Sequence, residues 1–109
     1  MKIAIVGSRS ITPNDFSAYV SEGDEIVSGG AVGVDRAAAE YARKKGLRLT
    51  EFLPDYARYG RAAPLIRNRA IVAYADKVVV FWDGRSKGSL SVIGEAKKTG
   101  KACEVVRCE

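Results

Sequence analysis

"EIVSGGAVGVDRAAAEYARKKG", residues 25–46, carries the clearest fold signal in the chain. Residues 25–28 form a short apolar run that predicts a buried strand, and the alanine-rich residues 34–45 predict a helix. Gly46 follows at the position where a glycine commonly ends a helix. The turn between strand and helix contains three glycines, Gly29, Gly30 and Gly33. Such a turn indicates backbone conformations that glycine allows, or a close approach to the main chain by another group.

Similar strand and helix patterns recur along the rest of the chain. We expect strands at residues 2–6, 25–28, 47–52, 77–82 and 102–106, and helices over about 34–45, 65–74 and 90–98, with one more beginning in "ITPNDF". The stretch "LPDYARYGRAAP", residues 53–64, predicts an irregular connection. Five strands that alternate with four helices predict right-handed crossovers and a parallel sheet. The expected architecture is one α/β domain over residues 1–109, a Rossmann-like three-layer sandwich with strand order 3-2-1-4-5.

The helix expected after the first strand has the residues of a typical helix start. Thr12 is a suitable cap, Pro13 suits the first helical position, and Asp15 complements the helix dipole. Ile11 and Phe16 have the spacing of a hydrophobic staple. We therefore expect a helix to connect the first two strands.

The composition limits the chemistry that the chain can perform. Eighteen Lys and Arg residues against 13 Asp and Glu give a formal charge of +5, which favours anionic partners. The chain has no histidine, which excludes imidazole bases and most zinc or iron sites. Cys103 and Cys108 predict free thiols in a reducing compartment. Because the apolar run "IAIV" is too short for a signal peptide or a membrane span, we expect a cytoplasmic protein, and we expect no metal or organic cofactor.

Three turns that follow strands carry glycines and polar side chains. They are "GSRS" at residues 7–10, "SGGAVGVD" at residues 28–35 and "DGRSKGS" at residues 83–89. The carboxyl ends of parallel strands share one edge of the sheet, where open α/β sheets bind their ligands. Glycines there expose main-chain amides, and helix N-termini favour negative charge. The sequence therefore predicts an anion site, most simply for a phosphate.

Neither of the two common phosphate motifs is present in full. A P-loop needs a lysine after its last glycine, but Lys87 precedes Gly88. A dinucleotide fingerprint needs glycine where Ser28 stands, although Glu51 lies at a spacing that imitates the ribose-binding acid. The prediction of a phosphate site therefore depends on the three turns together.

Taken together, the motifs resemble those of a known superfamily. They are "AIVGSR", "SGGAVGVDRAA", "PDYARYGRAAPLIRNRAIVAYAD" and "WDGRSKGS", which cover nearly the whole chain. The chain looks like the SLOG superfamily, which joins the DNA-processing protein DprA (Smf) to the Lonely Guy phosphoribohydrolases, and it is most similar to the small YspA-like branch. The resemblance implies a Rossmann-like fold, a nucleotide or nucleotide-derived ligand at the carboxyl edge of the sheet, and a homodimer.

The resemblance also implies two alternative functions. Lonely Guy enzymes cleave the N-glycosidic bond of nucleoside monophosphates with an arginine, matched by Arg67 in "RNRAI", and a glutamate, whose position holds Val92. Glu95 lies three residues further on, one helical turn away. The DprA-like members bind single-stranded DNA. In this chain basic and aromatic residues would track a backbone and stack bases, namely Arg58, Arg61, Arg67, Arg69, Arg85, Lys87, Tyr56, Tyr59 and Trp82.

The candidate site residues come from the three turns and the helix before the fourth strand. We expect ligand contacts from Gly7, Ser8, Arg9, Ser28, Gly29, Gly30, Gly33, Asp35, Arg67, Asn68, Asp83, Gly84, Ser86, Gly88 and Ser89. Arg9 and Arg67 would contact phosphate or base, Ser89 would help to cradle a phosphate, and residues 54–60 would form a lid. Asp35 would hold a ribose hydroxyl, an arginine or the turn itself. For hydrolysis, Arg67 would fix the 5′-phosphate and the candidate acids are Asp35, Asp83 and Glu95.

Overall fold

Five parallel strands form the centre of the computed structural model, which describes residues 1–108. The strands are β1 (Lys2–Gly7), β2 (Glu25–Ser28), β3 (Arg48–Glu51), β4 (Lys77–Trp82) and β5 (Ala102–Arg107). Their order is β3-β2-β1-β4-β5 and every pairing is parallel, which confirms the predicted α/β architecture and strand order. The two central strands, β1 and β4, are mostly buried, as their continuous apolar sequences predict.

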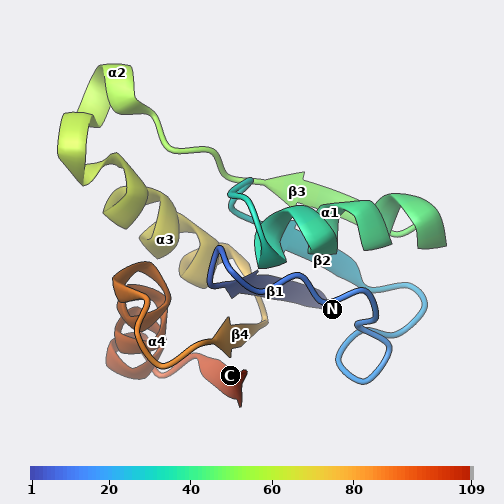
Figure 1. Cartoon of the computed structure of the whole chain (residues 1–109). Helices are drawn as coiled ribbons and strands as arrows, with labels where there is room; N and C mark the ends of the chain where they lie inside the picture. Colours follow the sequence, from blue (N-terminus) through green and yellow to red (C-terminus); the bar gives the residue numbers. More distant parts are fainter. Residues whose placement is uncertain (109) are drawn as a thin grey trace.

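Helices cover both faces of this sheet (Figure 1). α1 (Val34–Lys45) packs on one face, and α3 (Ala63–Tyr74) and α4 (Lys87–Thr99) pack together on the other. The short helix α2 (Tyr56–Tyr59) and the 3-10 helix η1 (Gly60–Ala62) extend from the body of the molecule before α3 begins (Figure 1). Within residues 1–108, no helix has the length and apolar character needed to cross a membrane.

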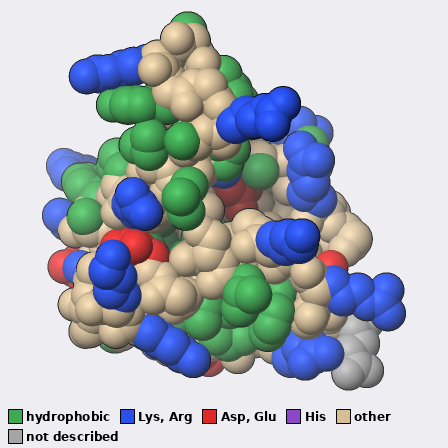
Figure 2. Space-filling model, turned by 90° about the vertical axis from the view of Figure 1, so that its left-hand side faces the viewer, with side chains coloured by type: hydrophobic (Ala, Val, Ile, Leu, Met, Phe, Trp, Pro, Cys, Tyr) green, Lys and Arg blue, Asp and Glu red, His purple; other side chains and the backbone are tan. Residues whose placement is uncertain are grey.

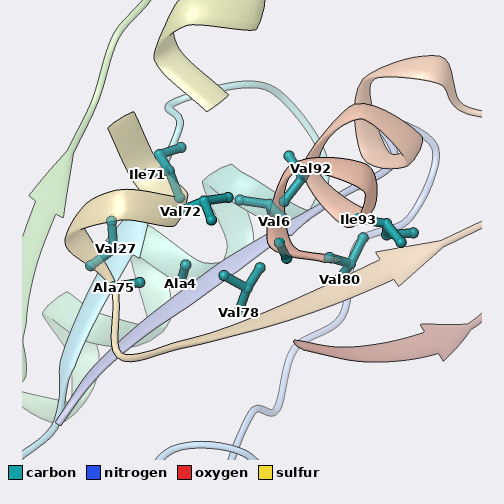
Figure 3. Close-up of a cluster of buried hydrophobic side chains, with 11 residues drawn as sticks. Ala4, Val6, Val27, Ile71, Val72, Ala75, Val78, Val80, Val92 and Ile93 are labelled. Atoms are coloured by element: carbon teal, nitrogen blue, oxygen red, sulfur yellow. The ribbon is translucent and has the colours of Figure 1, made fainter. Parts of the chain in front are cut away.

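The core consists of two layers of apolar side chains, one on each face of the sheet. Figure 3 shows the layer beneath α3 and α4, where Val6 and Val80 of the strands meet Val72 of α3 and Val92 of α4. On the other face, Phe16 is fully buried and makes edge-to-face contacts with the rings of Tyr41 and Phe81, at centroid distances of 5.4 and 5.5 Å. The sheet therefore has apolar cover on both faces, and its polar residues collect at its ends.

The helix predicted from "ITPNDF" is absent, and this prediction is wrong. The Asp15 carboxylate accepts a hydrogen bond from the Ser17 amide at 2.9 Å, which holds the backbone in a turn. The Phe16 carbonyl accepts hydrogen bonds from the amides of Tyr19 and Val20, which turns the chain so that Phe16 and Val20 enter the core. Tertiary burial of these two side chains thus outweighs the local helix-start signals.

The stretch predicted to be irregular, residues 53–64, is also more ordered than expected. Asp55 caps α2, because its side chain accepts a hydrogen bond from the Arg58 amide at 3.1 Å. Gly60 then ends α2 with a positive φ of 56°, and α3 begins at Ala63, earlier than predicted. α1 has its predicted position, α4 begins at Lys87, three residues before its predicted start, and the two helices end at Gly46 and Gly100 in the left-handed conformation.

Candidate functional site

The turns after β1, β2 and β4 meet at the carboxyl edge of the sheet and enclose a cleft of about 210 Å³ with part of α3. Its lining residues are Val6, Gly7, Arg9, Ala31, Asp35, Arg67, Asn68, Ser86, Gly88, Ser89 and Val92. Figure 2 views the side on which α2 and α3 lie in Figure 1 and shows Lys and Arg side chains around a hollow with acidic atoms at its bottom. The predicted convergence of the three turns is therefore present in the structure.

Gly29 lies between the two charged side chains that define this cleft. Its amide donates a hydrogen bond to Asp35 Oδ2 at 3.1 Å, and its carbonyl accepts one from Arg67 Nη1 at 2.5 Å. A Cβ atom at this position would lie 2.7 Å from Asp35 Oδ2 and 2.8 Å from Arg67 Nη1. The β2–α1 turn therefore needs glycine at position 29 because the two side chains close on its backbone from both sides.

Asp35 is a buried acid at the start of α1, with 4% of its surface exposed. Burial raises the pKa of Asp35 to about 6, although the charge of Arg67 and the backbone amides of Ala31, Gly29 and Gly7 favour the ionised form. Desolvation thus outweighs all the favourable interactions around this carboxylate. The sequence left three roles open for Asp35, and the structure shows two of them. The Asp35 carboxylate contacts the β2–α1 turn, and the charge of an arginine acts on it.

Arg67 is held in place from two directions. Its Nε donates to Asn68 Oδ1 at 2.8 Å, in addition to the Nη1 bond to Gly29. Asn68 is itself buried on α3, so the guanidinium is fixed to the protein core. Arg67 lines the cleft with a fixed planar group that can bind an anion through two hydrogen bonds.

The wall opposite Arg67 is the β4–α4 turn. Asp83 Oδ1 accepts hydrogen bonds from the amides of Arg85 and Ser86, at 2.8 and 2.9 Å, and these bonds lower the pKa of Asp83. The Asp83 amide in turn donates to Ser8 Oγ at 3.2 Å, which joins this turn to the turn after β1. Ser86 caps α4 by accepting a hydrogen bond from the Ser89 amide. Asp83 and Ser8 therefore hold the two turns in position but do not line the cleft.

Ser89 presents a free hydroxyl in the first turn of α4. The residue is 4% exposed, and its Oγ is buried without a hydrogen-bond partner among residues 1–108. Buried hydroxyls are normally satisfied, because leaving one unpaired costs about 1–3 kcal/mol. Since Ser89 lines the cleft, a ligand that accepts a hydrogen bond there would remove this cost.

A second cavity, of about 430 Å³, adjoins the cleft and shares Arg9, Ala31 and Arg67 with it. Its other lining residues are Gly29, Gly30, Val32, Pro54, Tyr56 and Pro64. The cleft thus combines charged and hydroxyl side chains with an apolar part of its wall, and the adjoining cavity offers aromatic, proline and glycine surfaces. The sequence missed Pro64 and Val32 as site residues, although it placed residues 54–60 over the site as a lid.

A wider groove of about 620 Å³ lies beyond Arg9, along the outer side of α1. It is lined by Arg9, Thr12, Pro13, Asn14, Val32, Gly33, Arg36, Ala37, Glu40, Tyr41 and Lys44. Most of its charged side chains, including Arg36 and Lys44, are exposed to solvent. We place the candidate site in the smaller cleft, because only there do buried polar groups converge.

Several of the predicted site residues have structural roles. Ser28 is fully buried, and its hydroxyl donates to the Asp35 carbonyl and accepts from the Gly30 amide. Gly84, with a φ of 84°, packs against the Arg107 guanidinium. Gly33 lies against the backbone of Arg9 in the wider groove, so it contributes to that groove and not to the cleft.

The candidate acids of a glycosidase differ in their positions. Glu95 lies 3.8 Å from Arg69 across the α3–α4 contact and does not line the cleft. Val92 does line it, with an apolar side chain that also packs in the core. Of the three candidate acids, only Asp35 reaches the cleft.

Comparisons of the chain with protein-family models, with curated proteins and with solved structures found no match. The class of the protein therefore follows from its own fold and site. It is an α/β protein with a five-stranded parallel sheet and a polar cleft at the carboxyl edge of that sheet. Among residues 1–108 no cluster of three or more metal-ligating side chains occurs, and Cys103 and Cys108 are free thiols.

The unpaired hydroxyl of Ser89 gives a testable prediction. Ser89→Ala should stabilise the free protein by about 1 kcal/mol, because it removes a buried unsatisfied group, and should weaken phosphate-ligand binding about fivefold. Ser91→Ala is the matched control, since Ser91 Oγ on α4 is also buried and unpaired but does not line the cleft. Chemical denaturation and ligand titration of both variants separate the two effects. Equal affinity losses in the two variants would contradict a binding role for Ser89.

Proposed function

We propose that the cleft binds the phosphate group of a nucleotide or nucleotide-derived ligand. The observation that carries this proposal is the arrangement of the fixed Arg67 guanidinium and the unpaired Ser89 hydroxyl on walls of the same small cleft. The N-terminal turn of α4, with Gly88 also on the lining, adds main-chain amides and the positive end of a helix dipole. These are the groups that bind phosphate oxygens in proteins.

The adjoining cavity suits the remainder of such a ligand. Tyr56, Pro54 and Pro64 offer flat and apolar surfaces for a base, and Gly30 and Ala31 add accessible backbone. Because Arg67 and Arg9 line both cavities, a ligand phosphate beside them would direct its sugar and base into the larger one. A mononucleotide or a derivative of one fits this division into a polar part and a ring-binding part.

We propose binding, as in a sensor or carrier of the ligand, ahead of hydrolysis. A glycosidase needs a carboxylate near the sugar, and the lining holds Val92 at the position where the resembled enzymes have glutamate. Asp35 is the one carboxylate on the lining. We further propose that the protein acts in the cytoplasm as a homodimer of this SLOG-like branch. The homodimer rests on the sequence resemblance, and the cytoplasmic location rests on the free thiols that Cys103 and Cys108 predict.

Single-stranded DNA binding is supported less well. Tyr56 is 60% exposed and Tyr59 is partly exposed, so both could stack bases. Trp82, however, is half-buried, and its Nε1 donates to the Ser86 carbonyl at 3.1 Å. One of the three aromatic groups expected for stacking is therefore occupied within the protein.

A thermal-shift panel tests the proposal. It contains the four nucleoside 5′-monophosphates, adenosine without phosphate, and a short single-stranded oligonucleotide. At least one monophosphate should raise the melting temperature by a few degrees at millimolar concentration, while adenosine should not. Chromatography of the same mixture should show no free base. No shift with any monophosphate would contradict the proposal, and an oligonucleotide effect that falls steeply with salt would favour DNA binding instead.

A further inference from the structure

The charged groups that face Asp35 are few and come from identified elements. Arg67 reaches it from α3, and Arg9 lines the same cleft from the turn after β1. α4 and its cap contribute only Ser86, Gly88, Ser89 and Val92 to the lining, none of which titrates. Asp35 is thus the one negative side chain in the cleft, and Arg67 is the cation whose charge favours its ionised form.

We propose that anion binding in this cleft is coupled to the uptake of one proton by Asp35. This inference rests on the proposed function, because it assumes that the ligand phosphate binds beside Arg67. A phosphate there would share the positive charge that now favours the carboxylate. It would also place a second negative group near a desolvated one, and like charges in a low-dielectric site cannot both remain ionised without cost.

The structure indicates where the proton would bind and what the protonated Asp35 side chain would do. Asp35 Oδ2 accepts the Gly29 amide at 3.1 Å, and the backbone amides of Ala31 and Gly7 also favour the carboxylate, so the proton adds to a carboxyl group that the backbone already orients. The proton comes from solvent, no other bond changes, and the resulting hydroxyl can donate to a ligand oxygen. Because burial already brings the pKa of Asp35 to about 6, protonation at neutral pH costs little compared with an ordinary carboxyl group.

The consequence for the ligand is a dependence of affinity on pH. A dianionic ligand should bind most tightly where Asp35 is protonated in the free protein, and its affinity should fall as pH rises above about 6. The folded-state pKa lies above the ordinary value, so the protonated form gains population as pH falls through 6. The cleft would therefore bind a dianion that keeps its charge, such as sulfate, most tightly under mildly acidic conditions.

Sulfate is the probe for this coupling, because it remains a dianion at both pH values of the test. Its dissociation constant should be roughly twentyfold lower at pH 5.5 than at pH 7.5 at constant ionic strength. In Asp35→Asn, which keeps an oxygen for the Gly29 amide, sulfate should bind equally at both pH values. Glu95→Gln is the matched control, since it removes a carboxylate outside the cleft and should keep the wild-type dependence.

Calorimetry with AMP gives an independent readout at pH 7.5, where its phosphate is almost fully dianionic. The binding enthalpy should vary between buffers of different ionisation enthalpy, as uptake of close to one proton requires, and this variation should vanish in Asp35→Asn. Binding of sulfate and AMP without proton uptake, or with uptake retained in Asp35→Asn, would overturn the coupling alone. Absence of binding at either pH would overturn the proposed function together with the coupling.

Discussion

Replacement of Asp35 by asparagine should stabilise the free protein by about 2 kcal/mol more at pH 7.5 than at pH 4. The folded-state pKa of Asp35 is about 6, against an ordinary value of 3.8. The unfolded chain therefore releases this proton at a lower pH than the folded protein does. Wild-type stability should fall between pH 4 and pH 6 and stay lower above pH 6, whereas the variant should lack this decrease.

Urea denaturation of both proteins at pH 4 and pH 7.5 measures this effect. Asp83→Asn is the control of opposite sign, because amide hydrogen bonds lower the pKa of Asp83 and its carboxylate should stabilise the fold above the ordinary carboxyl range. Its replacement should weaken the protein more at pH 7.5 than at pH 4. If Asp35→Asn also loses more stability at pH 7.5 than at pH 4, the Asp35 carboxylate stabilises the fold. Such a result would contradict the conclusion that desolvation outweighs the favourable interactions around it.

A stabilising substitution at Asp35 would show that the wild-type residue is retained at a cost to the fold. Natural binding sites commonly hold groups that reduce stability, because the group acts on a ligand. Ser89 fits the same description, since its buried hydroxyl has no partner among residues 1–108. These two polar residues lie in the first turns of α1 and α4, and both line the cleft together with Arg67.

The sheet and the location of the cleft could be predicted because their signals are local. The apolar runs mark the strands, and Gly46 and Gly100 mark the ends of α1 and α4, where the structure shows the left-handed conformation. Alternation of strands and helices then fixes the handedness of the connections, which brings the turns after β1, β2 and β4 to one edge. No contact between distant residues is needed for either conclusion.

Other features depend on contacts that the sequence does not display. The hydrogen bonds from Arg67 to Gly29 and from Asp83 to Ser8 join residues separated by 38 and 75 positions. The sequence therefore could not distinguish Ser8, which joins two turns, from Ser89, which lines the cleft and has a buried, unpaired hydroxyl. Burial of Phe16 is likewise a tertiary effect, and it decides the segment where the predicted helix does not form.

The most direct test of the phosphate cleft is a calorimetric titration of Arg67→Ala with the monophosphate that gives the largest thermal shift. We expect at least a hundredfold loss of affinity, because two charge-assisted hydrogen bonds to phosphate would be removed, each worth roughly 1.5–3 kcal/mol. Arg69→Ala is the matched control on the same helix, since Arg69 is 55% exposed and points to Glu95. Its affinity should stay within about twofold of wild type.

Arg67→Lys is a further control in the same titration for a loss of the fold. It keeps the positive charge and should recover only part of the affinity. We expect a large loss of affinity in Arg67→Ala, a smaller one in Arg67→Lys and none in Arg69→Ala, all in proteins that unfold cooperatively. Wild-type affinity in a folded Arg67→Ala protein would contradict this expectation and would place the ligand elsewhere on the molecule.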